Sequence, residues 1–120
     1  MTTITHPELV AKLAKPGQDI IDELTPRKAH CLHMASALMG EAGELFDAIK
    51  KWTIYGKKPD RVNIVEELGD IEFYMEGLRA ALEITREETI TSNITKLSER
   101  YATMSYSNEQ AQERADKKDG

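Results

Sequence analysis

Two long segments of this chain carry apolar residues at intervals of three and four, and this period restricts the fold more than any other feature of the sequence. The first stripe consists of Met34, Leu38, Leu45, Ala48 and Trp52. The second stripe consists of Ile64, Ile71, Tyr74, Leu78 and Ala81. At 100° per residue each set falls on one side of a helix. Because no segment alternates as a strand would, we predict an all-α fold.

The first long helix has clear boundary signals. Thr25 suits the N-cap and Pro26 the first helical position. The pattern predicts a helix over 26–52, about 40 Å long at 1.5 Å per residue. A short helix over 8–14 is expected before it, ending ahead of the break at Pro16-Gly17.

Three more helices follow from cap signals. Asp60 is a suitable N-cap for a helix over 61–83, after a loop at 53–59. Thr85 and Glu88 form a capping-box pattern, which predicts a third long helix to about residue 104. A similar pattern at Ser107 opens a short polar helix over about 108–117.

These helices suit one domain over 1–120, with its core at about 26–106, folded as an antiparallel helical bundle. The apolar arc of the first long helix spans roughly 160°, more than one neighbouring helix covers. A second chain is the simplest cover, so we expect the bundle to be completed by oligomerisation.

Charge and cysteine content narrow the function classes. The net charge of −5 argues against general nucleic-acid binding and against an anionic membrane surface as partner. The single cysteine, Cys31, excludes an internal disulfide and is expected to be a core residue. Residues 1–7 lack a signal-peptide pattern and no apolar run approaches a bilayer's thickness, so a cytoplasmic protein is expected.

Each long stripe contains a carboxylate where the period calls for an apolar residue. Glu41 takes this place in the first stripe and Glu67 in the second, and Glu44 and Asp70 follow three residues later on the same face. A carboxylate on a buried face normally binds a cation or loses its charge. If the two pairs converge, the all-oxygen cluster suits Mg²⁺ or Mn²⁺.

A structural interpretation of these acids stays open. Glutamates are common on helices, and ion pairs with Lys50, Lys51 or Arg79 could neutralise some of the four. A di-iron bundle is disfavoured, because it needs E-x-x-H pairs and no histidine here has a glutamate three residues before it.

The third long helix adds a row of polar residues beside its own apolar stripe. Asn93, Lys96 and Arg100 form this row. One amide and two cations next to a metal cluster would suit a triphosphate. The spacing alone favours the solvated flank of an amphipathic helix.

These residues together resemble a known family, the MazG-like all-alpha NTP pyrophosphohydrolases. The family motif is E-x-x-E, a spacer, then E-x-x-D, and here it is read as Glu41 to Glu44, 22 residues, and Glu67 to Asp70. Sequences of family members are similar to three segments of this chain, EAGELFDAIKKW, NIVEELGDIEFYMEGL and NITKLSERY. His33 matches a frequent family histidine. The likeness spans about residues 30–106.

The resemblance implies a fold and a reaction. The fold is a helical bundle that assembles as a dimer or a dimer of dimers. The reaction is Mg²⁺-dependent cleavage of the α–β phosphate bond of a (d)NTP to NMP and pyrophosphate. The single short copy of the motif suggests a compact phage- or prophage-type member. The alternatives are a phosphoribosyl-ATP or alarmone pyrophosphohydrolase, or a non-catalytic helical adaptor.

The resemblance also assigns roles to residues. The metal ligands would be Glu41, Glu44, Glu67 and Asp70. The nucleotide contacts would come from Asn93, Lys96, Arg100 and His33. Glu44, with Glu41 beside it, is the preferred general base, although sequence does not separate it from its neighbours. Trp52 either stacks on a base or packs in the core.

The chain departs from the family pattern at two places. Ala102 stands where the family usually has proline after the tyrosine, which affects the loop expected to close the site. Glu66 adds a fifth acid, which we expect to face solvent.

Overall fold

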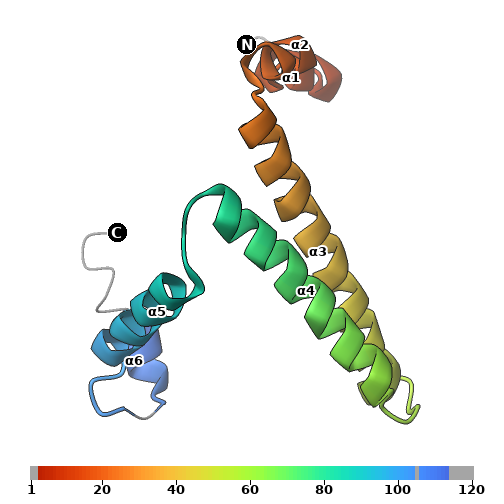
Figure 1. The fold of residues 1–120 in the computed structure, drawn as a ribbon. Coiled ribbons are helices and arrows are strands. Elements are labelled where there is room, and N and C mark those ends of the chain that lie inside the picture. The colour runs from red at the N-terminus through yellow and green to blue at the C-terminus, as the bar shows by residue number, and fades with distance from the viewer. Residues whose placement is uncertain (1–2, 105, 114–120) are drawn as a thin grey trace.

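A computed structural model describes residues 3–104 and 106–113, and this part of the chain contains helices and no strand, as predicted (Figure 1). The helices are α1 (His6–Leu13), α2 (Gly17–Glu23), α3 (Pro26–Thr53), α4 (Arg61–Ala81), α5 (Arg86–Arg100) and α6 (Asn108–Glu113). None of the helices in these two ranges is long and apolar enough to cross a membrane.

The predicted starts of the long helices are confirmed by their caps. The Thr25 hydroxyl accepts a hydrogen bond from the Lys28 backbone N–H at 3.2 Å. Asp60 Oδ1 accepts one from the Asn63 N–H at 3.1 Å. The Thr85 hydroxyl likewise accepts from the N–H of Glu88, at 3.0 Å. Each cap satisfies one of the N–H groups that the first turn of a helix leaves without a partner.

The helix ends differ from the prediction. α4 stops at Ala81, two residues early, where Glu83 takes a positive φ of 58°. α5 stops at Arg100 rather than about 104, because Tyr101 leaves the helical region with ψ 75°. α2 was not predicted. The last helix ends within the described residues at Glu113, and positions 114–117 of its predicted span lie outside them.

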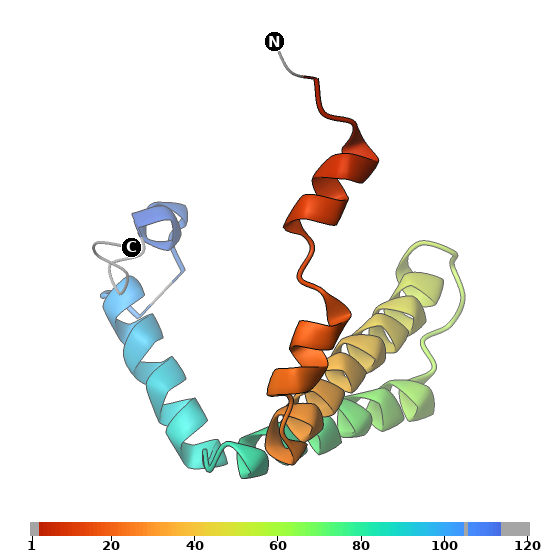
Figure 2. The same ribbon diagram turned by 90° about the horizontal axis from the view of Figure 1, so that it is seen from above.

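α3 and α4 run antiparallel and form the only extensive helix–helix packing among the described residues (Figures 1 and 2). Met34 and Ala48 are the buried apolar residues of this pair. Gly77 allows close approach, since a Cβ there would lie 2.6 Å from Met34 Sδ. Nearer the start of α3, Arg27 Nε donates to the Ala81 carbonyl at 2.9 Å.

The chain is extended. α5 and α6 lie apart from the α3–α4 pair, and α1 and α2 continue beyond the start of α3 (Figures 1 and 2). The radius of gyration is 20.4 Å, against about 13.5 Å for a compact 120-residue domain. Large apolar side chains remain exposed along every long helix. The predicted bundle is therefore present only as the α3–α4 pair within one chain.

The N-cap of α3 gives a stability prediction. We expect Thr25→Ala to lower the free energy of unfolding by about 1 kcal/mol, because the Lys28 N–H loses its acceptor. Thr25→Ser keeps the hydroxyl and is the matched control. Urea unfolding followed by circular dichroism at one fixed protein concentration measures both, and equal stability of the two variants would contradict a capping role for this hydroxyl.

Candidate metal site

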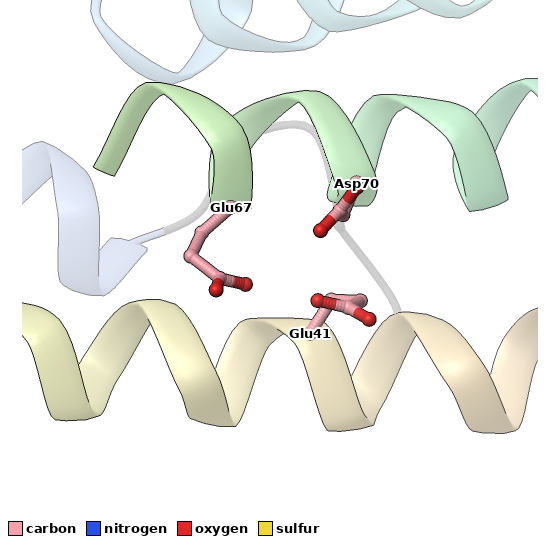
Figure 3. A group of neighbouring side chains, drawn as sticks. All are labelled: Glu41, Glu67 and Asp70. Atoms are coloured by element: carbon pink, nitrogen blue, oxygen red, sulfur yellow. The ribbon is translucent and has the colours of Figure 1, made fainter. Parts of the chain in front are cut away.

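α3 and α4 bring three of the predicted acids together. One carboxylate oxygen from each of Glu41, Glu67 and Asp70 lies within 4.8 Å of the other two. Figure 3 shows Glu41 rising from α3 to meet Glu67 and Asp70 from α4. Glu41 and Glu67 are half-buried, whereas Asp70 is exposed. The predicted convergence of the two helices' carboxylates is therefore found for these three residues.

The local sequence explains why these side chains meet. Glu41 and Glu67 each replace one member of an apolar stripe, and those stripes form the facing sides of α3 and α4. Leu38, Leu45, Ile64 and Ile71, one turn to either side of the acids, are half-buried in the same contact. Asp70 is three residues after Glu67, so it lies on the same side of α4.

The two inner carboxylates are not satisfied by the protein. Glu41 Oε2 and Glu67 Oε2 are buried from solvent and have no hydrogen-bond donor. Two ionised carboxylates cannot donate to one another, and burying such groups without a partner is costly. The pair therefore needs either a shared proton or a bound cation.

Burial and repulsion both act on the charge of this pair. Burial, the hydrogen bond that a protonated Glu41 donates to Glu67, and the negative charges of Glu44 and Asp70 raise the pKa of Glu41 from 4.5 to about 7. Burial, followed by repulsion from Glu44 and Asp70, raises the pKa of Glu67, and the hydrogen bond with Glu41 partly opposes that rise. Glu44 itself is exposed at the edge of the cluster.

The basic side chains nearby pair elsewhere. Lys51 Nζ lies 3.1 Å from Asp47, and Lys50 Nζ lies 3.9 Å from the same residue. Arg79 is buried and contacts Glu76 at 2.9 Å. Among the described residues, none of the ion pairs expected as an alternative neutralises the carboxylate cluster. The structural interpretation based on Lys50, Lys51 and Arg79 is therefore wrong for these acids.

The predicted nucleotide contacts do not lie at the cluster within one chain. Asn93, Lys96 and Arg100 are on α5, which lies apart from α3 and α4 (Figures 1 and 2). His33 is exposed on α3, eight residues before Glu41. Trp52 is 47% exposed. At this exposure Trp52 does not pack in a core within the single chain, so of its two predicted roles the core one is wrong for one chain.

The sequence pattern did not predict the hollows among the described residues, and two of these lie at α5 and at the α3–α4 loop. The first, about 350 Å³, is formed by α5 and the turn after it and is lined by Asn93, Ile94, Leu97, Ser98, Tyr101, Met104 and Tyr106. The second, about 220 Å³, lies at the α3–α4 loop and includes Lys51, Lys57, Lys58 and Asn63. Only the local excess of lysine over 51–58 signalled the second in the sequence.

The fold and the cluster define an all-helical protein with an acidic site consistent with divalent-metal binding. A family model described as "MazG nucleotide pyrophosphohydrolase domain" matches residues 30–105, more than half of the chain. The chain belongs to this family of nucleotide pyrophosphohydrolases. A search of curated proteins and a search of solved structures each found no match.

The raised pKa of Glu41 predicts how the metal-free protein responds to pH. The pKa of this acid is about 7 in the folded state and 4.5 ordinarily, so the folded state binds the proton more tightly. This proton binding contributes fully to stability below pH 4.5, and the contribution is lost as pH rises through about 7. Glu41→Gln removes the titration. With EDTA present, we expect the melting temperature of the variant minus that of the wild type to increase from about pH 5 to about pH 8. A constant difference would contradict the assignment.

Proposed function

We propose that this protein hydrolyses the α–β phosphate bond of nucleoside triphosphates, giving a nucleoside monophosphate and pyrophosphate. The observation that carries the proposal is the pair of buried, unsatisfied oxygens of Glu41 and Glu67 beside Asp70. In a member of this family, such a cluster is best explained by a cation that also binds the substrate's phosphates.

The donor set fits a hard divalent cation. Glu41, Glu44, Glu67 and Asp70 offer only oxygens, which Mg²⁺ prefers and Mn²⁺ accepts. When bound, the ion would neutralise phosphate charge and polarise the phosphorus under attack. Without it, the four carboxylates would repel a triphosphate, because all the charges are negative.

Side chains would activate the attacking water and bind the nucleotide. Glu44, exposed at the edge of the cluster, is proposed to orient and deprotonate the attacking water, with Glu41 as the alternative. Lys96 and Arg100 would offset charge on the leaving pyrophosphate. Asn93 and His33 would contact the nucleotide, and the half-exposed Trp52 is available to stack on a base.

Self-association is part of the proposal. One chain buries only Met34 and Ala48 as apolar core among its described residues, and it leaves Met39 78% and Phe46 65% exposed. Exposed apolar surface on this scale is typical of protein–protein interfaces. We infer a homo-oligomer, a dimer or a dimer of dimers, in which other copies cover these faces.

The reaction is tested by incubating the purified protein with a panel of NTPs and dNTPs, with Mg²⁺ and with EDTA, and separating the products by ion exchange. Monophosphate plus pyrophosphate, dependent on Mg²⁺, is the expected result. Diphosphate plus phosphate would contradict the cleavage position. Hydrolysis of phosphoribosyl-ATP or of an alarmone, but of no NTP or dNTP, would identify that compound as the substrate class instead. Absence of both turnover and metal binding would favour a helical adaptor.

A further inference from the structure

The loop that joins α3 to α4 carries a concentration of positive charge in a chain that is otherwise acidic. Residues 50–61 contain five basic side chains and one acidic side chain, whereas the whole chain has a net charge of −5. The hollow of about 220 Å³ at this loop is lined by Ala48, Lys51, Lys57, Lys58, Asp60 and Asn63. Three ammonium groups against one carboxylate make this loop hollow attractive to an anion.

Backbone hydrogen bonds hold the loop against the last turn of α3. Lys57 N–H donates to the Lys51 carbonyl at 3.1 Å, and Tyr55 N–H donates to the Lys50 carbonyl at 3.3 Å. Gly56 between them has a φ of 69°, a conformation that glycine takes without strain. The loop therefore turns back on the helix, which brings Lys57 and Lys51 to the same hollow.

Most of the positive charge in the loop hollow is available to a ligand. Lys57 and Lys58 make no ion pair within the described part of the chain. Lys51 contacts Asp47 at 3.1 Å, but both side chains are more than half exposed, and such surface pairs are weak. The carboxylate of Asp60 already accepts the N-cap hydrogen bond of α4. A phosphate group could therefore bind several ammonium groups here.

The loop hollow opens on the same side of the helix pair as the exposed acids. Lys51 is seven residues after Glu44, and Asn63 is seven residues before Asp70. Seven residues return a helix to within about 20° of the same direction. Because α3 and α4 are antiparallel, both steps lead toward the loop (Figure 1). At 1.5 Å per residue, the hollow begins about 6 Å from the acids, at Ala48, and reaches Lys51 at about 10 Å.

We propose that the loop hollow binds the terminal phosphates of the substrate. A nucleoside triphosphate would then lie along the α3–α4 pair, with its metal-bound phosphates at the acids and its diphosphate end among Lys51, Lys57 and Lys58. These lysines would offset charge on the leaving pyrophosphate from the same chain that supplies the acids, without any contribution from α5. The orientation of the nucleotide rests on the proposed function, whereas the binding of a diphosphate group to the hollow does not.

Calorimetry with inorganic pyrophosphate in EDTA tests the hollow without metal and without turnover. The wild type should bind pyrophosphate, and Lys57→Gln/Lys58→Gln should bind it at least about tenfold more weakly, because two charged donors are lost. Lys50→Gln/Arg61→Gln is the matched control. It removes two charges from the same region but none from the lining, so its affinity should stay within about threefold of the wild type. No binding by the wild type, or equal losses in both double variants, would overturn the proposal.

Kinetics with Mg²⁺ test whether the hollow takes the substrate's own phosphates. In Lys57→Gln/Lys58→Gln, kcat/KM for NTPs should fall at least about tenfold. The inhibition constant of the product monophosphate should stay within about twofold, because that product has no terminal phosphates. An unchanged kcat/KM would overturn the assignment of the hollow to the substrate. If the wild type hydrolyses no nucleotide, the proposed function fails, and calorimetry still decides whether the hollow binds a diphosphate group.

Discussion

Glu41→Gln should reduce nucleotide hydrolysis by at least about 1000-fold, because an amide removes both the charge that holds the cation and half of the buried carboxyl pair. The same variant should no longer be stabilised by Mg²⁺. Without metal it should be more stable than the wild type near pH 8, since it relieves repulsion with Glu67 and Asp70. Steady-state product assays and thermal melts with and without Mg²⁺ measure both effects.

Glu66→Gln is the matched control for that experiment. Glu66 is adjacent to Glu67 in the sequence, is exposed, and is not a member of the acidic cluster. It removes the same charge from α4, the helix that packs against α3, so we expect activity within about twofold of the wild type. Equal losses in Glu41→Gln and Glu66→Gln would indicate that overall charge, rather than the cluster, supports the reaction.

The long helices were predictable because local signals determine them. Thr25-Pro26 and Asp60 fix where α3 and α4 begin, through side-chain hydrogen bonds that need no tertiary context. The predicted ends of α4 and α5 were too late in the sequence. Glu83 and Met104, which follow these helices, adopt positive φ values that non-glycine residues seldom take. α2 has a proline at its N-cap without a side-chain cap bond, so it lacked the signal used for the other helices.

The acidic cluster was predictable because carboxylates are unusual within apolar stripes. A carboxylate within an apolar stripe identifies a face, and antiparallel pairing brings the two faces together at Glu41 and Glu67. The position of Lys96 was not predictable in this way. It depends on the direction of the chain after α4, which the turn at Glu83 and Ile84 determines. The sequence pattern placed Lys96 beside an apolar stripe but did not say which groove that stripe covers.

Phe46→Glu should separate the oligomer. Leu32, Met39 and Phe46 recur every seven residues on α3, are 58%, 78% and 65% exposed, and lie on the side of the helix opposite Glu41. If another copy covers this face, a charge at its aromatic residue should weaken association at least about 30-fold. Sedimentation over a range of protein concentrations measures the shift toward the 13.5 kDa single chain.

Phe46→Leu keeps the apolar contact and should retain assembly close to that of the wild type. Because Phe46 points away from the acids, any loss of hydrolysis in Phe46→Glu should be recovered at high protein concentration, where association is restored by mass action. Loss of activity at every concentration with assembly intact would instead place Phe46 in the site. A wild-type protein that sediments as one chain at all concentrations would contradict self-association.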